Sequence, residues 1–135
     1  MRKLILLIGI MISVLLLTGC FEQQSASVDN DFKDVKLVSN VVTLIQGDIV
    51  KNLDDGRIYS VDVNYRFKNP TNRYVYVNVT AEWYDAEDNL LYSGGFKQIG
   101  LREGWEEVLV NSFTYNDHDA SKVDHVKLIA LEAKF

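Results

Sequence analysis

Hydrophobic and polar residues alternate most regularly in two runs, residues 58–68 and 74–85, which flank a single turn. Successive side chains of a β-strand point to opposite faces, so a period of two predicts a strand with one buried face. A helix would scatter the same apolar residues around its circumference. We therefore expect two central strands, whose buried faces carry Tyr59, Val61, Val63, Tyr65 and Phe67 in the first run and Val75, Val77, Val79, Ala81 and Trp83 in the second.

The turn between these runs contains Pro70, the one proline of the chain. Proline has no N–H and a fixed φ, so it ends the first strand. Asn69 and Asn72 can hydrogen-bond to nearby backbone and tolerate turn conformations. Two geometries fit: the strands pair as a hairpin, or the turn arches between two sheets. Both bury the same ten residues.

Weaker alternation and turn residues mark the other strands. Asp55-Gly56 is a strong short turn signal, and Ser93-Gly94-Gly95 reads as a joint between two short strands. Seven or eight strands at this spacing predict an all-β antiparallel sandwich over residues 32–135. Its remaining strands are expected in segments 32–46 (one or two, broken near 39–40), 48–51, 90–92, 96–101, 105–115 (with a bulge) and 126–135.

The first 19 residues are typical of a secretion signal. Arg2 and Lys3 precede an apolar run, residues 4–17, that is shorter than a membrane span. The string Leu17-Thr18-Gly19-Cys20 resembles the lipobox of bacterial lipoproteins. That resemblance implies cleavage before Cys20 and its lipidation. Two or more acyl chains, palmitate among them, anchor a protein stably to a bilayer. Cys20 is also the one cysteine, which excludes a disulfide within the chain.

The leader sets the expected location and surroundings of the protein. The polar segment 20–31 reads as the lipidated cysteine followed by a flexible spacer. Phe21 is not the aspartate that is associated with inner-membrane retention. In a host with two membranes we therefore expect the outer membrane, facing the periplasm, and otherwise the outer face of the plasma membrane. Without residues 1–19 the chain holds 12 basic and 19 acidic residues, which argues against nucleic acid as a partner.

Motifs for catalysis, metals or cofactors are weak in this sequence. His118 and His125 stand among aspartates, but a zinc site usually needs three or four spaced ligands. Segment 85–89 is acidic yet lacks the glycine of an EF-hand loop. Glu106 and Glu107 are adjacent in an expected strand, so they would point to opposite faces. We therefore predict no enzyme activity, no metal site and no cofactor.

One outward face is rich in tyrosine instead. Tyr74, Tyr76 and Tyr84 fall on the polar side of the second central strand. Tyrosine combines a large apolar body with a polar tip and is enriched at interfaces. Cross-strand pairing in a solvated sheet is the simpler explanation. The functional hypothesis is a surface for a protein partner or a second copy of the chain.

The string Glu82-Trp83-Tyr84-Asp85, with the alternation around Val61 and Tyr76 and the turn at Gly104, resembles the YcfL-like family of small bacterial lipoproteins. The resemblance covers about residues 42–131. It implies an immunoglobulin-like or fibronectin-like sandwich, which favours the arch. Family members commonly carry glycine soon after the Trp-Tyr-Asp string. This chain has Asn89 there, and asparagine tolerates positive φ.

The leading functional expectation is a lipid-anchored, non-catalytic interaction domain of the cell envelope, with an envelope protein as its partner. Some members of the YcfL-like family are encoded near a lipoprotein activator of peptidoglycan synthases, so the resemblance implies a role in envelope or peptidoglycan maintenance. The alternative is a carbohydrate-binding or hydrolytic envelope protein that uses Trp105 and the nearby acids.

Overall fold

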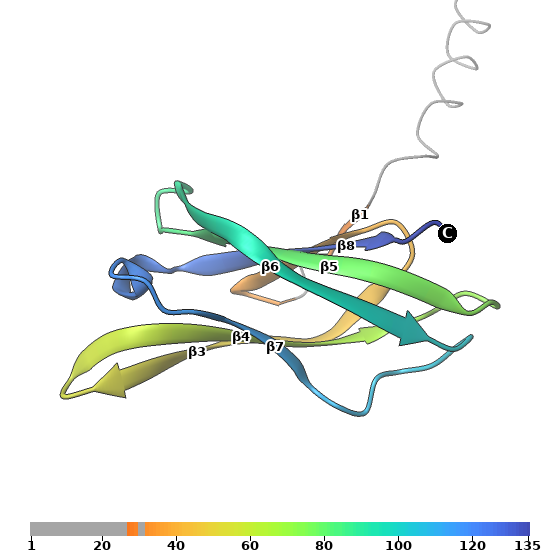
Figure 1. The fold of residues 1–135 in the computed structure, drawn as a ribbon, viewed down its shortest axis with the longest axis horizontal. Helices are drawn as coiled ribbons and strands as arrows, with labels where there is room; N and C mark the ends of the chain where they lie inside the picture. The colour runs from red at the N-terminus through yellow and green to blue at the C-terminus, as the bar shows by residue number, and fades with distance from the viewer. Residues whose placement is uncertain (1–26, 30–31) are drawn as a thin grey trace, which may run out of the picture.

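The computed structural model describes residues 27–29 and 32–135, and this part of the chain is an all-β sandwich of two sheets (Figure 1). The predicted signal peptide, residues 1–19, and the lipidation site Cys20 lie outside the described residues. The strands are β1 (Ser27–Asp29), β2 (Val35–Ser39), β3 (Thr43–Asp54), β4 (Arg57–Lys68), β5 (Val75–Tyr84), β6 (Leu90–Leu101), β7 (Asn111–Tyr115) and β8 (His125–Glu132).

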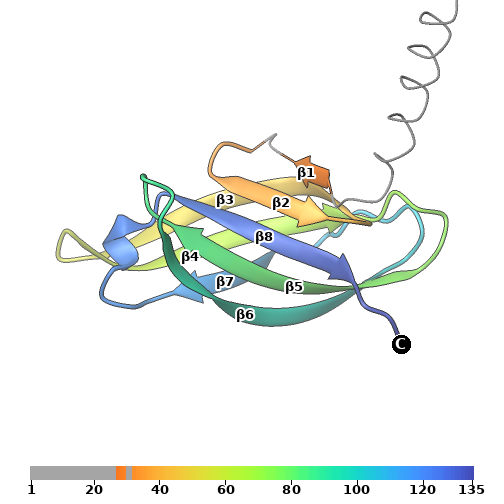
Figure 2. The same ribbon diagram turned by 90° about the horizontal axis from the view of Figure 1, so that it is seen from above.

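One sheet has five strands in the order β1-β2-β8-β5-β6, and the other has three in the order β3-β4-β7. All neighbouring strands are antiparallel except β2 and β8, which run parallel. Figure 2 shows the five-stranded sheet lying across the three-stranded one, with β6 and β7 along the same flank. β8 is the middle strand of the five-stranded sheet, and its Val126, Leu128 and Ala130 are buried in the core.

The two central strands belong to different sheets, so the turn at Pro70 is an arch and not a hairpin. Their inward faces meet and form the core, in which Trp83 of β5 stacks on Tyr115 of β7 across the sheets at 5.6 Å between ring centroids. Nine of the ten residues predicted to be buried are at most 1% exposed. Burial of one such side chain stabilises the fold by about 1.5–3 kcal/mol.

Tyr59 is the exception, and its predicted burial is wrong, because it is 55% exposed. It lies at the start of β4, beside the β3–β4 turn, where the register shifts between Asn52 and Leu53. The hairpin formed by β3 and β4 therefore extends beyond the core. Its turn is the one expected at Asp55-Gly56, and both residues have positive φ, 50° and 74°, as in a type I′ turn.

Two strand predictions are corrected by the structure. Segments 90–92 and 96–101 are parts of one strand, β6, and Gly95 and Phe96 form a bulge opposite Thr80. Gly95 takes the positive φ of 81° that such a bulge requires. The strand expected over 105–115 is limited to β7, and residues 105–110 form an irregular connection with one isolated bridge, Lys68 to Glu106.

Two further expectations change in detail. The residue with positive φ in the 85–89 turn is Asp88, at 63°, and not Asn89. Asp85 caps this turn, because its carboxylate accepts hydrogen bonds from the Asn89 and Glu87 backbones, which lower its pKa. The spacer expected over residues 20–31 is interrupted by β1, which pairs with β2. Within the described residues, no helix has the length and apolarity that crossing a membrane requires.

Candidate functional site

The connection between β6 and β7, residues 102–110, crosses from one sheet to the other at the same end as the Pro70 arch. It begins with a turn at Gly104, whose φ is 66°. Its backbone is then tied to the arch and to β4: Gly104 N donates to Thr71 O, Asn69 N donates to Trp105 O, and Glu107 N donates to Phe67 O, at 2.8–3.1 Å. The backbone of residues 104–107 is therefore fixed by the neighbouring elements.

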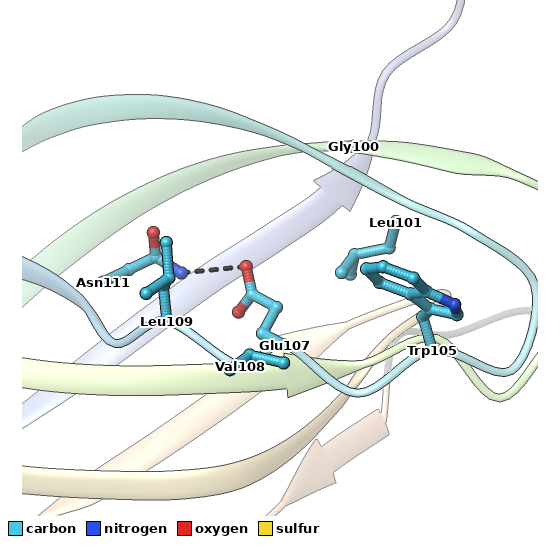
Figure 3. A pocket seen from close by; sticks show the side chains of 7 residues that line it. All are labelled: Gly100, Leu101, Trp105, Glu107, Val108, Leu109 and Asn111. Carbon is cyan, nitrogen blue, oxygen red and sulfur yellow. Dashed lines mark hydrogen bonds between the residues drawn. The ribbon is translucent and has the colours of Figure 1, made fainter.

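The side chains of this connection frame a hollow beside the end of β6 (Figure 3). Its volume is about 330 Å³. Val108 and Leu109, which lie between this held segment and β7, are 80% and 81% exposed. The hollow is lined by Gly100, Leu101, Trp105, Glu107, Val108, Leu109 and Asn111. A mostly apolar concave surface of this kind is suited to receive an apolar group.

Glu107 is the one ionisable side chain of the hollow, and both of its oxygens are engaged. Oε2 accepts a hydrogen bond from the Phe67 backbone N–H at 2.8 Å, and Oε1 accepts one from Asn111 Nδ2 at 2.9 Å. Burial, with a further contribution from the Glu107 charge, raises the pKa of Tyr65. Through these two hydrogen bonds Glu107 joins β4 to the start of β7, so its carboxylate has a structural role.

Trp105 and Glu106, the other members of the expected carbohydrate or hydrolytic site, point to different surroundings. The Arg102 guanidinium lies 5.3 Å from the centroid of the Trp105 ring. Glu106 lies on the exposed side of the connection, 3.7 Å from Lys68 Nζ. Glu106 and Glu107 thus have separate partners. Trp83, the second tryptophan, is in the core, as the sequence predicted.

The three tyrosines of the candidate partner surface do not form one group. Tyr74 and Tyr76 are 50% and 42% exposed, and their ring centroids are 4.9 Å apart. Tyr84 lies at the other end of β5, where it donates a hydrogen bond to Glu82 and stacks on His125 at 5.3 Å. Phe135 joins the first pair instead, in edge contact with Tyr76 at 5.4 Å.

The histidines are also separated. His118 lies with Asp117 and Asp119 in the β7–β8 connection, where the possible ligand atoms are all within 4.8 Å of one another. His125 instead contacts Asp88 at 2.9 Å and Asp124 at 3.0 Å. The backbone N–H and ring of His118 hydrogen-bond to Asp117 and lower its pKa. Local hydrogen bonding explains this exposed cluster without an ion.

Sequence reasoning missed the most exposed residues of the hollow, Val108 and Leu109. The sequence pattern places them in the strand expected over 105–115, where the alternation is irregular. A signal was present, because Val108-Leu109-Val110 places three apolar residues in a row next to the Glu106-Glu107 pair. Such a run cannot have one buried and one solvated face, and it indicates either burial on both sides or exposure.

Comparison with known proteins identifies likenesses of fold only. No protein-family model matches the chain, and no curated protein matches it either. A crystal structure of Campylobacter jejuni cj0090 is similar over 76% of this chain and 100% of its own, at 13% identity and a TM-score of 0.49. A DUF1425 family member from Shewanella sp. pv-4 is similar over 83% of this chain and 94% of its own, at 12% identity and a TM-score of 0.47. At these values neither likeness carries a functional argument, and the fold is assigned from the strand pairing.

Proposed function

We propose that the protein is a lipid-anchored, non-catalytic binding protein of the cell envelope, and that its β-sandwich receives a protein partner at the hollow beside β6. The single observation that carries the binding proposal is the exposure of Val108 and Leu109 directly after a backbone segment, residues 104–107, that is held by hydrogen bonds. Exposed apolar groups beside a preformed hollow are typical of interaction sites. The lipobox ending at Cys20 supports the anchor, and the resemblance to YcfL-like lipoproteins supports an envelope role.

A non-catalytic role is favoured over the carbohydrate-binding or hydrolytic alternative by the state of the acids. Glycoside hydrolysis needs two carboxyl groups that flank one bond. Here both oxygens of Glu107 bond to Phe67 and Asn111, while Glu106 lies near Lys68. Arg102 covers one side of the Trp105 ring that would otherwise stack on a sugar. The same contacts leave the aliphatic side chains of the hollow available to a partner.

Partner capture with matched variants tests the binding site. The acylated full-length protein is captured from detergent-solubilised membranes, and the co-purifying proteins are compared among variants. Val108→Asp with Leu109→Asp places charges where an apolar group would be desolvated. We expect binding of the specific partner to fall by about 2 kcal/mol, roughly thirtyfold. Leu53→Asp is the matched control, because Leu53 is also an exposed leucine, at 63%, but lies in the β3–β4 hairpin. Equal capture by the double variant and the control would reject the hollow as the binding site.

Fractionation tests the anchor independently. Cys20→Ser removes the acyl acceptor, so we expect the variant to leave the membrane fraction and to lack the acyl mass. A variant that stays in the membrane fraction at the wild-type level would contradict the lipoprotein proposal. The capture result and the fractionation result are separable, since the residues concerned lie more than 80 positions apart in the sequence.

A further inference from the structure

The chain enters the sandwich at a defined end. Strand β1 begins at Ser27, which pairs with Ser39 of β2, and Ser39 in turn pairs with Ala130 near the end of β8. The directions of the strands place this entry at the end that carries the Pro70 arch and the 102–110 connection. We call it the tether end. Figures 1 and 2 show the C-terminus and these two connections together there.

The distance from this end to the proposed anchor is short. Six residues, 21–26, lie between Cys20 and Ser27. Fully extended chain spans at most about 3.6 Å per residue, so the seven steps from Cys20 to Ser27 reach no farther than about 25 Å. If Cys20 is acylated, as proposed above, the start of β1 stays within that distance of the lipid, and the tether end is the end of the sandwich that lies next to the anchor.

Aromatic side chains are exposed at the tether end. Tyr74, Tyr76 and Phe135 form what we call the tether-end patch, with exposed fractions of 50%, 42% and 93%. The Tyr74 ring contacts the Tyr76 ring, and the Tyr76 ring contacts the Phe135 ring. Gly100 of β6 lies under the tyrosines, since an added Cβ there would collide with the Tyr74 hydroxyl. The rings therefore lie against the sheet and form one surface.

Charge is distributed unevenly between the two ends. At the tether end the cations Lys68, Arg73, Arg102 and Lys134 offset the carboxylates Glu103, Glu106, Glu107 and Glu132. The described turns of the opposite end hold nine carboxylates against three cations: Asp34, Asp54, Asp55, Asp85, Glu87, Asp88, Asp117, Asp119 and Asp124 against Lys33, Arg57 and Lys122. An anionic bilayer surface repels the acidic end and tolerates the balanced one.

We infer that the tether-end patch lies in the interfacial layer of the bilayer to which Cys20 anchors the protein. Tyrosine is enriched at the membrane–water interface because its ring is apolar and its hydroxyl is hydrated. Arginine and lysine beside it keep their charges in the headgroup layer. The short tether selects lipid rather than a protein partner for this patch. Contact there holds the acidic end away from the membrane.

Spin labels at the two ends test the inference in the full-length acylated protein. Acylation occupies Cys20, so an introduced cysteine is the free thiol that takes a nitroxide. Asn72→Cys places the label on the exposed arch beside Tyr74, and Ala86→Cys places it on the exposed turn at the opposite end. The protein is reconstituted in vesicles of phosphatidylethanolamine and phosphatidylglycerol. Flotation reports anchoring, and collision of the label with a water-soluble nickel complex reports burial in lipid.

We expect both proteins to float and the collision rate at position 72 to be several-fold lower than at position 86. The triple substitution Tyr74→Ser, Tyr76→Ser and Phe135→Ser should restore the rate at position 72 while flotation continues. A protein that floats with equal rates at both positions overturns the inference and leaves the anchor intact. A protein that does not float overturns both proposals. A label at position 72 that is shielded in native membranes but accessible in the vesicles assigns the patch to a protein partner, and the bilayer inference then fails.

Discussion

Two connections cross between the sheets at the tether end. One buries a polar residue, and the other exposes apolar residues. In the arch from β4 to β5, the polar residue Asn69 is fully buried. In the connection from β6 to β7, the aliphatic residues Val108 and Leu109 are about four-fifths exposed. Hydrogen bonding explains the burial of Asn69. No contact within the described residues explains the exposure of Val108 and Leu109. The comparison separates a residue that holds the fold from residues that are available to a partner.

Asn69 joins the two connections to each other. Its side-chain amide donates to the carbonyl oxygens of Arg73, Leu101 and Arg102 at 2.8–3.1 Å. Its side-chain oxygen accepts from the backbone N–H and the hydroxyl of Thr71. A buried polar group is stable only when it is hydrogen-bonded. Asn69 meets this requirement with partners from both crossings, so it fixes their relative position.

Replacing Asn69 should therefore cause the largest loss. Asn69→Ala leaves the carbonyl groups of Leu101 and Arg102 and the N–H of Thr71 without these partners, and we expect the free energy of unfolding to fall by about 3 kcal/mol. Urea denaturation measures the change. Asn72→Ala is the matched control, because Asn72 is an exposed asparagine of the same arch, and it should change stability by less than about 0.5 kcal/mol. Equal midpoints for the two variants would show that Asn69 does not stabilise the crossings.

The sequence predicted the sandwich and nearly all of the central core, because alternation is a local property. It predicted the buried set of β5 completely and failed in β4 only at Tyr59, which lies beyond the opposing sheet. The hydrophobic pattern of a strand does not show where the strand extends past the opposing sheet. The predicted extent of β7 was wrong for the same reason. Residues 105–110 belong to the connection between β6 and β7, and its backbone hydrogen-bonds to the end of β4.

The candidate site was less predictable than the fold. Trp105 was recognised as a candidate, but Val108 and Leu109 were assigned to a strand and Asn69 only to a turn. The exposure of the first two and the burial of the third depend on which segments meet at the tether end. Tyr84 was grouped with Tyr74 and Tyr76 by alternation alone, although about eight residues of strand, roughly 26 Å, separate them.

Tyr65 sharpens the comparison, because it is a buried polar residue without the pairing that Asn69 has. Among the described residues its hydroxyl is buried and has no hydrogen-bond partner. Tyr65→Phe removes the cost of desolvating that hydroxyl, so we expect a gain of about 1 kcal/mol in the free energy of unfolding. Tyr115→Phe is the matched control. It loses a hydrogen bond to Asp119, and it should destabilise the protein by about 1 kcal/mol.

The pH dependence of the Tyr65→Phe effect provides a second measurement. Burial raises the pKa of Tyr65 above its ordinary value of 10.0, so the neutral form is favoured in the folded state. The stability that depends on a neutral Tyr65 is complete below pH 10. It is lost as the pH rises above the pKa that Tyr65 has in the unfolded state. We therefore expect the advantage of the phenylalanine variant to widen above pH 10. A constant advantage across that range would show that Tyr65 ionises equally in both states.

The smallest expected effect concerns the exposed connection itself. If Val108 serves a partner and not the fold, Val108→Ala should change the free energy of unfolding by less than about 0.5 kcal/mol. Leu101 lines the same hollow but is 2% exposed, and Leu101→Ala should cost about 3 kcal/mol because it leaves a cavity. Thermal and urea unfolding of the two variants make the contrast measurable within one site. A loss for Val108→Ala as large as that for Leu101→Ala would mean that the connection packs as part of the core. The apolar exposure on which the binding proposal rests would then be absent in solution.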